Sequence, residues 1–232
     1  MDVIIKLNSQ TAGRDKLVRL LQYASKAAWH FLQQKEVNRR SVDKLKSLEY
    51  TFSSFRKLLR LGRFLDTLYS ALVSVHYEDL VVRATCTLSK IAHALFLLAD
   101  NMLWVGRTGL VSVDSERWNK VANKYWLASV AMNLARDLYE VLRLLERGSR
   151  GPPAPAWYSA GPPRKGLPLA TLAREHKDVL VDTVKNGCDL MIPLTALGYA
   201  RLSPGAVGVL GVVSSLAAIV GLVDPEARLE PS

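Results

Sequence analysis

The sequence predicts an all-α fold: a helical membrane protein with amphipathic helices and at least one C-terminal transmembrane helix. The first observation is that apolar residues recur at intervals of three and four over most of the chain. The second is Pro204–Val223, a stretch of 20 residues without a charged side chain. Hydrophobic residues make up 49% of the 232 positions, so the chain has enough apolar material for a core and is not of the disordered class.

Five segments carry the helical spacing. They are residues 17–32, 41–75, 80–104, 115–145 and 169–199. Ser41 and Ser115 are expected to cap the second and fourth of these helices, because a serine hydroxyl accepts hydrogen bonds from the first free backbone amides. Residues 91–105 are strongly apolar, but His93 and Asp100 interrupt them, which favours a core or interfacial helix over a membrane span.

A Pro- and Gly-rich stretch divides the chain. Residues 148–168 contain six Pro and four Gly, and this composition predicts a linker or an exposed loop. We therefore expect a basic region of amphipathic helices in residues 1–147. Residues 169–232 are expected to form a C-terminal helical region that contains the transmembrane helix.

The stretch Pro204–Val223 is long enough to cross a membrane. At about 1.5 Å per residue its helix measures about 30 Å, the thickness of the hydrocarbon core of a bilayer. A buried core helix is the alternative interpretation. A hairpin of this helix with residues 188–200, through a turn at residues 201–203, is the less favoured alternative, because Asp189 and Pro193 stand in that leg and Arg201 in the turn. The number of spans stays open.

Small residues share one face of this C-terminal helix. Small side chains let two helix backbones approach closely, so this face is a candidate for self-association and predicts a homo-oligomer. The other interpretation is that these residues only make the helix thin. The residues concerned are Gly208, Gly211, Ser215 and Ala218.

The positive charge lies mainly at the start of the chain. There are 31 Lys and Arg against 21 Asp and Glu, a formal net charge of +10, and 14 of the 31 stand in the first 70 residues. Such a region needs an anionic partner: nucleic acid, an acidic protein or an anionic phospholipid membrane. The transmembrane candidate favours the membrane. Because no helix-turn-helix, zinc-finger or RNA-binding signature accompanies the basic residues, we expect no nucleic-acid partner.

Residues 41–65 form the most informative amphipathic pattern. At 100° per residue one arc of the helix carries the apolar, membrane-inserting candidates Leu45, Leu48, Phe52, Phe55, Leu58 and Leu59. The other side carries the basic, lipid-binding candidates Lys46, Arg56, Lys57, Arg60 and Arg63. This pattern is typical of a helix that lies in a lipid interface.

Two interpretations of residues 41–65 stay open. An ordinary helix would pack its apolar arc on neighbouring helices and expose its basic side to water. An interfacial helix would enter one leaflet as a wedge and favour positive curvature. A membrane anchor holds such a helix at high local concentration near lipid, so we favour the wedge, with residues 1–147 as the membrane-remodelling region.

The sequence offers little for catalysis. We find no nucleophile elbow, phosphate-binding loop, dinucleotide fingerprint or zinc-protease motif. The four histidines and the cysteines Cys86 and Cys188 are scattered without metal-ligand spacing. We therefore expect no enzyme, no metal and no cofactor. A channel would need polar residues on the inner faces of several spans, so it remains only an alternative.

Five stretches resemble the peroxin-eleven family of peroxisomal membrane proteins. GRDKLVRLLQYASK at residues 13–26 looks like the family's N-terminal signature, and RKLLRLGRFLDTL at 56–68 looks like its basic amphipathic motif. DNMLWVGRTGL at 100–110, KYWLASVAMNLARDLYE at 124–140 and the Gly-rich segment 205–223 are similar to its middle and C-terminal parts. The resemblance covers nearly the whole chain apart from the Pro-rich stretch.

The resemblance implies an integral membrane protein of the peroxisome with its N-terminal region facing the cytosol. The family promotes elongation, proliferation and fission of peroxisomes, deforms the membrane with its amphipathic helix, self-associates, and works with the dynamin-type fission machinery and its membrane adaptors. A peroxisomal membrane channel for small metabolites is the alternative that the family also implies. By position, the deformation motif falls on Arg56, Lys57, Leu58, Leu59, Arg60, Leu61, Gly62 and Arg63.

Overall fold

The computed structural model describes residues 2–35, 39–149, 176–224, 227 and 229, and this part of the chain contains eight helices and no strand. The all-α prediction is therefore confirmed. The helices are α1 (Asp2–Ser9), α2 (Thr11–Gln34), α3 (Arg39–Leu59), α4 (Arg63–Ser74), α5 (Leu80–Arg107), α6 (Ser115–Ser149), α8 (Lys177–Ala196) and α9 (Pro204–Val223). The predicted linker 148–168 lies outside the described residues except for its first two positions, which end α6.

The predicted helix over residues 41–75 is wrong as a single element. Helix α3 ends at Leu59 and α4 begins at Arg63, and Gly62 between them has a φ of 77°. Glycine adopts this left-handed conformation without steric cost, so the chain turns here and the amphipathic segment is divided. An isolated glycine inside a helical pattern does not by itself predict a break.

Polar side chains cap the helices on either side of the bundle. Asp79 accepts hydrogen bonds from the backbone amides of Val81 and Val82 at the start of α5, at 2.8 and 3.2 Å. Asp114 accepts from the amides of Glu116 and Arg117 at the start of α6, both at 3.1 Å. The predicted cap Ser115 is thus wrong by one residue, because the carboxylate before it takes the free amides.

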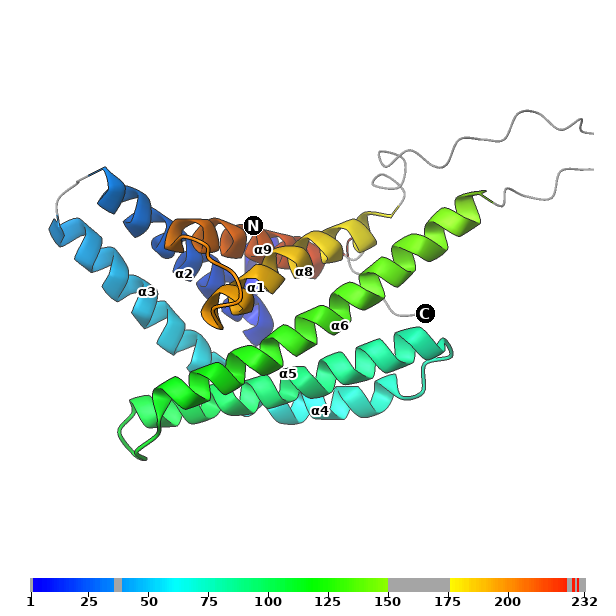
Figure 1. Cartoon of the computed structure of the whole chain (residues 1–232), viewed down its shortest axis with the longest axis horizontal. Coiled ribbons are helices and arrows are strands. Elements are labelled where there is room, and N and C mark those ends of the chain that lie inside the picture. Colours follow the sequence, from blue (N-terminus) through cyan, green and yellow to red (C-terminus); the bar gives the residue numbers. More distant parts are fainter. Residues whose placement is uncertain (1, 36–38, 150–175, 225–226, 228, 230–232) are drawn as a thin grey trace, which may run out of the picture.

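The helices form three packed groups (Figure 1). The long helices α5 and α6 make a hairpin, and α4 packs against α5. Helices α2 and α3 make a second hairpin, in which the two helices run alongside each other. Helices α8 and α9 make the third, in which α9 packs on α2 and α8 packs on α6. A helical hairpin therefore precedes and includes Pro204–Val223, but its connection covers residues 197–203 instead of the turn at 201–203, and α8 is not among the candidate membrane spans of the described residues.

Two apolar clusters hold these groups together. The first joins α5 to α6 and is built around Phe96, Leu97 and Leu103. The second joins α2, α8 and α9 through Tyr23, Ile192 and Val207. Trp126 on α6 packs against both clusters and stacks on Phe96, with 5.7 Å between the ring centroids. The N-terminal helices and the C-terminal hairpin thus share a core.

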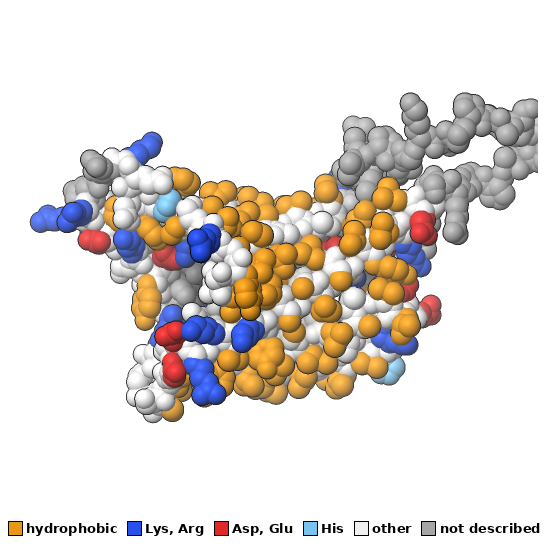
Figure 2. All heavy atoms as spheres, viewed as in Figure 1, with side chains coloured by type: hydrophobic (Ala, Val, Ile, Leu, Met, Phe, Trp, Pro, Cys, Tyr) orange, Lys and Arg blue, Asp and Glu red, His pale blue; other side chains and the backbone are white. Residues whose placement is uncertain are grey.

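The outer surface of the bundle is rich in apolar side chains. Figure 2 shows them gathered over α4, α5 and α6, with charged side chains mainly towards the ends. Among the described residues two helices, α5 and α9, are long and apolar enough to cross a membrane. The C-terminal helix that the sequence predicted as a span is one of them. The other contains residues 91–105, where the sequence had favoured a core or interfacial helix over a span. Exposed apolar residues include Leu68, Tyr69 and Leu72 of α4, Leu88 and Leu95 of α5, Leu138 and Leu142 of α6, and Val209, Val213 and Leu216 of α9.

Candidate functional site

Helix α3 turns its apolar arc outwards. Leu48, Phe55 and Leu58 are 41%, 46% and 43% exposed, although they are among the largest apolar side chains of the helix. The other three residues of the arc, Leu45, Phe52 and Leu59, are half-buried. Exposed large apolar side chains in a continuous row are a contact surface for lipid or for another protein.

The basic side of α3 faces the interior instead. Arg56 and Lys57 are buried, at 9% and 8% exposure, and Arg60 and Arg63 are half-buried. Lys46 is the exposed member of the five, and its ammonium group lies 4.8 Å from the ring centroid of Trp29. Arg39, Arg40 and Lys44, nearer the start of α3, are exposed as well. Four of the five basic residues that the sequence nominated for lipid binding therefore line the inside of the bundle.

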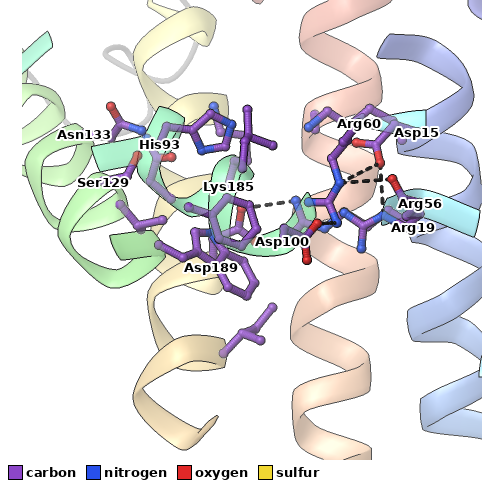
Figure 3. Close-up of a pocket in the computed structure, with 18 of the residues that line it drawn as sticks. Asp15, Arg19, Arg56, Arg60, His93, Asp100, Ser129, Asn133, Lys185 and Asp189 are labelled. Atoms are coloured by element: carbon purple, nitrogen blue, oxygen red, sulfur yellow. Dashed lines mark hydrogen bonds and ion pairs between the residues drawn. The ribbon is translucent and has the colours of Figure 1, made fainter. Parts of the chain in front are cut away.

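Asp15 of α2 holds two of these basic residues. Its Oδ1 lies 3.2 Å from Arg56 Nε and 3.8 Å from Arg60 Nε (Figure 3). Arg56 also donates from Nη1 to Gln22 Oε1 at 2.8 Å. Burial alone would raise the pKa of Asp15, but the positive charges of Arg56 and Arg60 outweigh burial and lower this pKa to about 2.

Asp100 of α5 holds the next pair. It forms ion pairs with Lys57 and, at 2.7 Å between Arg60 Nη2 and its Oδ2, with Arg60. The Arg60 guanidinium also lies 5.4 Å from the ring centroid of Phe96. The two carboxylates and the three basic residues that they hold form what we call the α3 ion-pair latch. Its members are Asp15, Arg56, Lys57, Arg60 and Asp100. This latch fixes the rotation of α3 about its own axis, with the apolar arc outside.

The latch residues were not found from the sequence. The carboxylates stand 41 and 43 positions from their partners, and a helical wheel of one segment says nothing of such pairings. Asp100 did interrupt an apolar run, and a charge in such a run is a signal of an internal partner. Lipid contact by the basic residues stays a prediction.

A polar cavity of about 970 Å³ lies behind α3, between α2, α5, α6, α8 and α9 (Figure 3). Tyr23, Phe96 and Trp126 contribute aromatic walls, and Ala217, Ala218 and Leu222 contribute apolar ones. The ionic residues of the lining are more basic than acidic. They are Lys16, Arg19, Arg56, Lys57, Arg60, Arg63, Lys90 and Lys185 against Asp15, Asp100, Asp182 and Asp189.

Arg19 and Asp189 join α2 to α8 across this cavity. Arg19 donates from both terminal nitrogens to the two carboxylate oxygens of Asp189, with Nη1 at 3.2 Å from Oδ2. The guanidinium lies 5.5 Å from the ring centroid of Tyr23 and 6.0 Å from that of Trp126. Ser214 of α9 donates to the same carboxylate. This bidentate pair anchors the C-terminal hairpin to the N-terminal helices.

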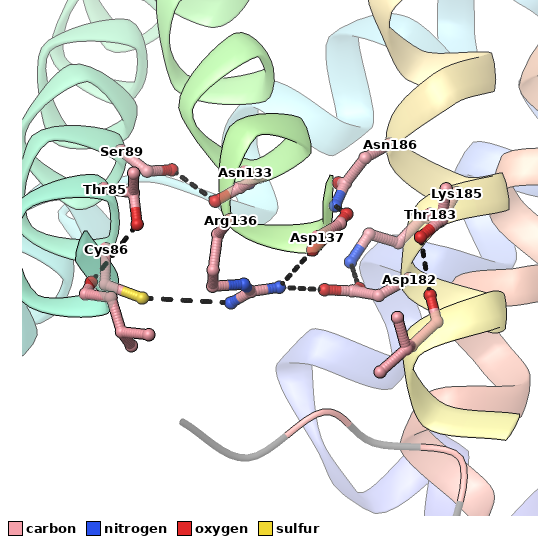
Figure 4. A network of polar contacts seen from close by, with 12 residues as sticks. Thr85, Cys86, Ser89, Asn133, Arg136, Asp137, Asp182, Thr183, Lys185 and Asn186 are labelled. Atoms are coloured by element: carbon pink, nitrogen blue, oxygen red, sulfur yellow. Dashed lines mark hydrogen bonds and ion pairs between the residues drawn. The ribbon is translucent and has the colours of Figure 1, made fainter. Parts of the chain in front are cut away.

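A second ionic network joins α6 to α8 (Figure 4). Arg136 donates to Asp137 at 2.9 Å and forms an ion pair with Asp182. Asn186 donates from Nδ2 to Asp137 Oδ2 at 2.6 Å. Burial raises the pKa of Asp137, although Asn186 and Arg136 oppose this effect. Buried polar groups with several partners of this kind favour one arrangement of the two helices.

The small-residue face of α9 packs on α2 within the same chain. A Cβ atom on Gly208 would lie 2.6 Å from the backbone nitrogen of Ala27, and one on Gly211 would lie 2.2 Å from the ring of Tyr23. Ser215 is buried and Ala218 is half-buried and lines the cavity. The close approach expected of this face is present, but its partner here is α2. Self-association through these residues stays a prediction.

No group of three or more His, Cys, Asp or Glu is placed to hold a metal ion within the described ranges. Burial raises the pKa of the Cys188 thiol, which lies on α8. The chemistry that the arrangement supports is therefore that of charge pairing inside and apolar contact outside.

Comparisons with known proteins place the chain in one family over most of its length. The model of the Peroxisomal biogenesis factor 11 family matches residues 1–223. The chain is 37% identical to Peroxisomal membrane protein 11B of Homo sapiens, and the match covers 100% of both chains. It is 32% identical to Peroxisomal membrane protein 11A of Homo sapiens, over 99% of each. It is 28% identical to Peroxisomal membrane protein 11C of Homo sapiens, over 88% of this chain and 86% of the other. No solved structure matches.

Proposed function

We propose that the chain deforms and elongates the peroxisomal membrane. The premise is that it belongs to the peroxisomal biogenesis factor 11 family of peroxisomal membrane proteins. In this proposal the apolar arc of α3 enters one leaflet, and copies of the chain that gather in the membrane promote proliferation and fission of peroxisomes.

The outward apolar arc of α3 is the observation that carries the proposal. Full burial of a Leu or Phe side chain is worth about 1.5–3 kcal/mol. Leu48, Phe55 and Leu58 are each a little less than half exposed, so moving all three from water into lipid is worth about 2–4 kcal/mol. The helix is already folded and fixed by the α3 ion-pair latch, so this energy is not spent on ordering the chain.

Helix α4 extends the same surface. Leu65, Leu68 and Leu72 follow the turn at Gly62 and are 60%, 46% and 61% exposed. The apolar surface offered to the membrane interface thus follows two helix axes, that of α3 and that of α4. A body that occupies area in one leaflet but not in the other favours positive curvature, and this effect grows with the number of copies per unit area.

Several parts of the proposal come from the family and from the sequence. The N-terminal region faces the cytosol, where it reaches anionic phospholipid. The chain forms homo-oligomers, and the dynamin-type fission machinery and its membrane adaptors act on the elongated membrane. Because α2 covers Gly208 and Gly211, an oligomer of this folded form would use the exposed residues of α9 around Val209 and Val213.

Reconstitution of the full chain into vesicles tests the proposal. The variant carries Leu48→Ser, Phe55→Ser and Leu58→Ser. A matched control carries Leu138→Ser, Leu142→Ser and Leu145→Ser on α6, where the side chains are 60%, 52% and 40% exposed. Both variants lose three large exposed apolar side chains, so they differ only in the helix affected. Electron microscopy of vesicles with anionic phospholipid counts tubules at equal protein density.

We expect the unchanged chain and the α6 variant to form tubules, and the α3 variant to form at least fivefold fewer. Equal loss in the two variants would contradict a special role of α3, since any loss of apolar surface would then suffice. Tubules formed normally by the α3 variant would overturn the proposal outright.

The polar cavity favours a second candidate, a membrane channel for small metabolites. Channels line their path with polar and charged side chains, and the cavity behind α3 has such a lining. Planar-bilayer recording of the reconstituted chain separates the candidates. Steady single-channel conductance supports the channel, whereas tubulation without conductance supports the membrane shaper.

A further inference from the structure

The cavity behind α3 holds more positive charge than its own carboxylates balance. Each of its four aspartates already has a basic partner: Asp15 and Asp100 in the latch, Asp182 with Lys185 and Arg136, and Asp189 with Arg19. Lys16 and Arg63 line the cavity as well. Neither has an ion pair with any described residue.

Two further lining residues bear on this site: Lys90 adds to the excess of positive charge, whereas the charge of Arg19 is balanced by Asp189 and only one of its nitrogens is unpaired. Lys90 donates to the backbone oxygen of Ser70 at 3.0 Å and lies over the ring of Tyr77, but it has no acidic partner among the described residues. Arg19 is 5% exposed, and its Nε is buried without a hydrogen-bond partner although its terminal nitrogens are paired. A buried donor that lacks an acceptor costs about 1–3 kcal/mol.

Lys16 and Arg19 stand one helical turn apart on α2, so they reach the cavity from the same side. Burial, and after it the like charge of Arg19, lowers the pKa of Lys16 to about 8. The outer surface around this cavity is apolar, and ionised side chains inside such a body require counter-charges. The described part of the chain therefore leaves some of the positive charge of the cavity without a counter-charge.

We propose that this cavity is a binding site for a phosphate group, either of a free phosphate or of a lipid headgroup. Lys16, Arg63 and Lys90 are the basic lining residues without acidic partners among the described residues. A phosphate monoester carries about 1.5–2 negative charges at pH 7 and several strong acceptor oxygens, so one group can balance more than one positive charge. A single carboxylate brings only one charge.

The cavity accommodates both sources of phosphate. Its volume of about 970 Å³ exceeds what a free phosphate needs, and its apolar walls at Ala217, Ala218 and Leu222 could accept part of an acyl chain. The site lies inside the bundle, away from the outward arc of α3. It therefore stands or falls independently of the curvature proposal, which depends on the outer surface.

The experiment uses the full chain in two kinds of nanodisc. In the first arm, discs of phosphatidylcholine are equilibrated by dialysis with radiolabelled inorganic phosphate at constant ionic strength. In the second arm, discs contain phosphatidic acid, and native mass spectrometry counts the phosphatidic acid that each chain retains. Lys16→Gln and Arg63→Gln are made separately, so that one variant remains if the other does not fold. The control is Lys124→Gln, which removes an exposed charge from α6 outside the cavity.

We expect saturation near one phosphate group per chain in at least one arm. Lys16→Gln and Arg63→Gln weaken that binding at least tenfold, while Lys124→Gln changes it less than twofold. Binding in the first arm alone identifies a free phosphate, and binding in the second alone identifies a headgroup. Absence of binding in both arms overturns the proposal. So does an equal loss in the Lys124→Gln variant, because binding would then reflect only the overall positive charge.

Discussion

Replacing Asp15 by Asn tests the α3 ion-pair latch most sharply. The substitution keeps the size of the side chain but removes its charge. Arg56, 9% exposed, would lose its ionic partner and keep only neutral acceptors such as Gln22, and Arg60 would keep only Asp100 as an ionic partner. Breaking a buried ion pair by removal of one partner costs about 3–5 kcal/mol.

The pKa of Asp15 gives a second measure of the same interaction. It falls from the usual 3.8 to about 2 in the folded chain, which corresponds to about 2 kcal/mol of stabilisation at pH 7. We therefore expect Asp15→Asn to lower the free energy of unfolding by about 2–4 kcal/mol at pH 7. Because the folded pKa is depressed, this stabilisation is complete above pH 4 to 5 and disappears as the pH falls through 2.

The assay is unfolding by graded addition of sodium dodecyl sulfate to the chain in a mild detergent, followed by circular dichroism. The control is Asp43→Asn, which removes an exposed carboxylate from α3 itself. The difference between the unchanged chain and Asp15→Asn should fall to about half by pH 3. A loss below 0.5 kcal/mol at pH 7, equal to that of the control, would refute the latch. A difference independent of pH between 7 and 3 would show that the effect is not one of charge.

Three further predictions follow from other contacts. Gly211→Ala should lower the free energy of unfolding by about 1–3 kcal/mol, because its Cβ would meet the ring of Tyr23 at 2.2 Å; Gly187→Ala has open space around it and should be neutral or stabilising. Equal effects of the two in the same detergent assay would contradict close packing of α9 on α2. Lys16→Met should raise the free energy of unfolding of the phosphate-free chain at pH 7. This gain over the unchanged chain should shrink as the pH rises from 8 to 10.5, since burial penalises only the charged lysine. A constant gain over this range would exclude a charge effect. Asn186→Leu should destabilise the α6–α8 contact, because Asp137 loses the donor at 2.6 Å. Amide hydrogen exchange in α6 and α8 should therefore rise more than in the control Asn123→Leu, which changes an exposed hydrogen-bond site on α6. An equal rise in both variants would refute the prediction.

The elements with strong local patterns were predictable from the sequence. Pro204–Val223 is a helix with the predicted bounds. Its signals are local: the stretch has no charge, a proline stands at its first position, and the Ser203 hydroxyl before it accepts from the amide of Ala206. The apolar arc of α3 was also readable from its spacing. The break at Gly62 was not, because the same residue is tolerated within many helices and its left-handed conformation depends on how α4 packs against α5.

The interior of the candidate site could not be derived from local patterns. Arg56 and Asp15 meet only because α2 and α3 form a hairpin, and Lys57 meets Asp100 only because α5 lies behind α3. A basic face that turns to water and one that turns to internal carboxylates give the same helical wheel. The small residues of α9 likewise predict a close contact but not its partner, which here is α2.

The central claim is that the outward arc of α3 lies in lipid while its basic side is held inside the bundle. Spin labels at Leu58 and, as an aqueous reference on the same helix, at Asp43 measure this directly in reconstituted vesicles of anionic phospholipid. We predict that the label at Leu58 collides more often with oxygen than with a water-soluble nickel chelate, and that the label at Asp43 shows the opposite order. Equal collision with the nickel chelate at both positions would mean that the arc lies in water, and the account of α3 would be wrong.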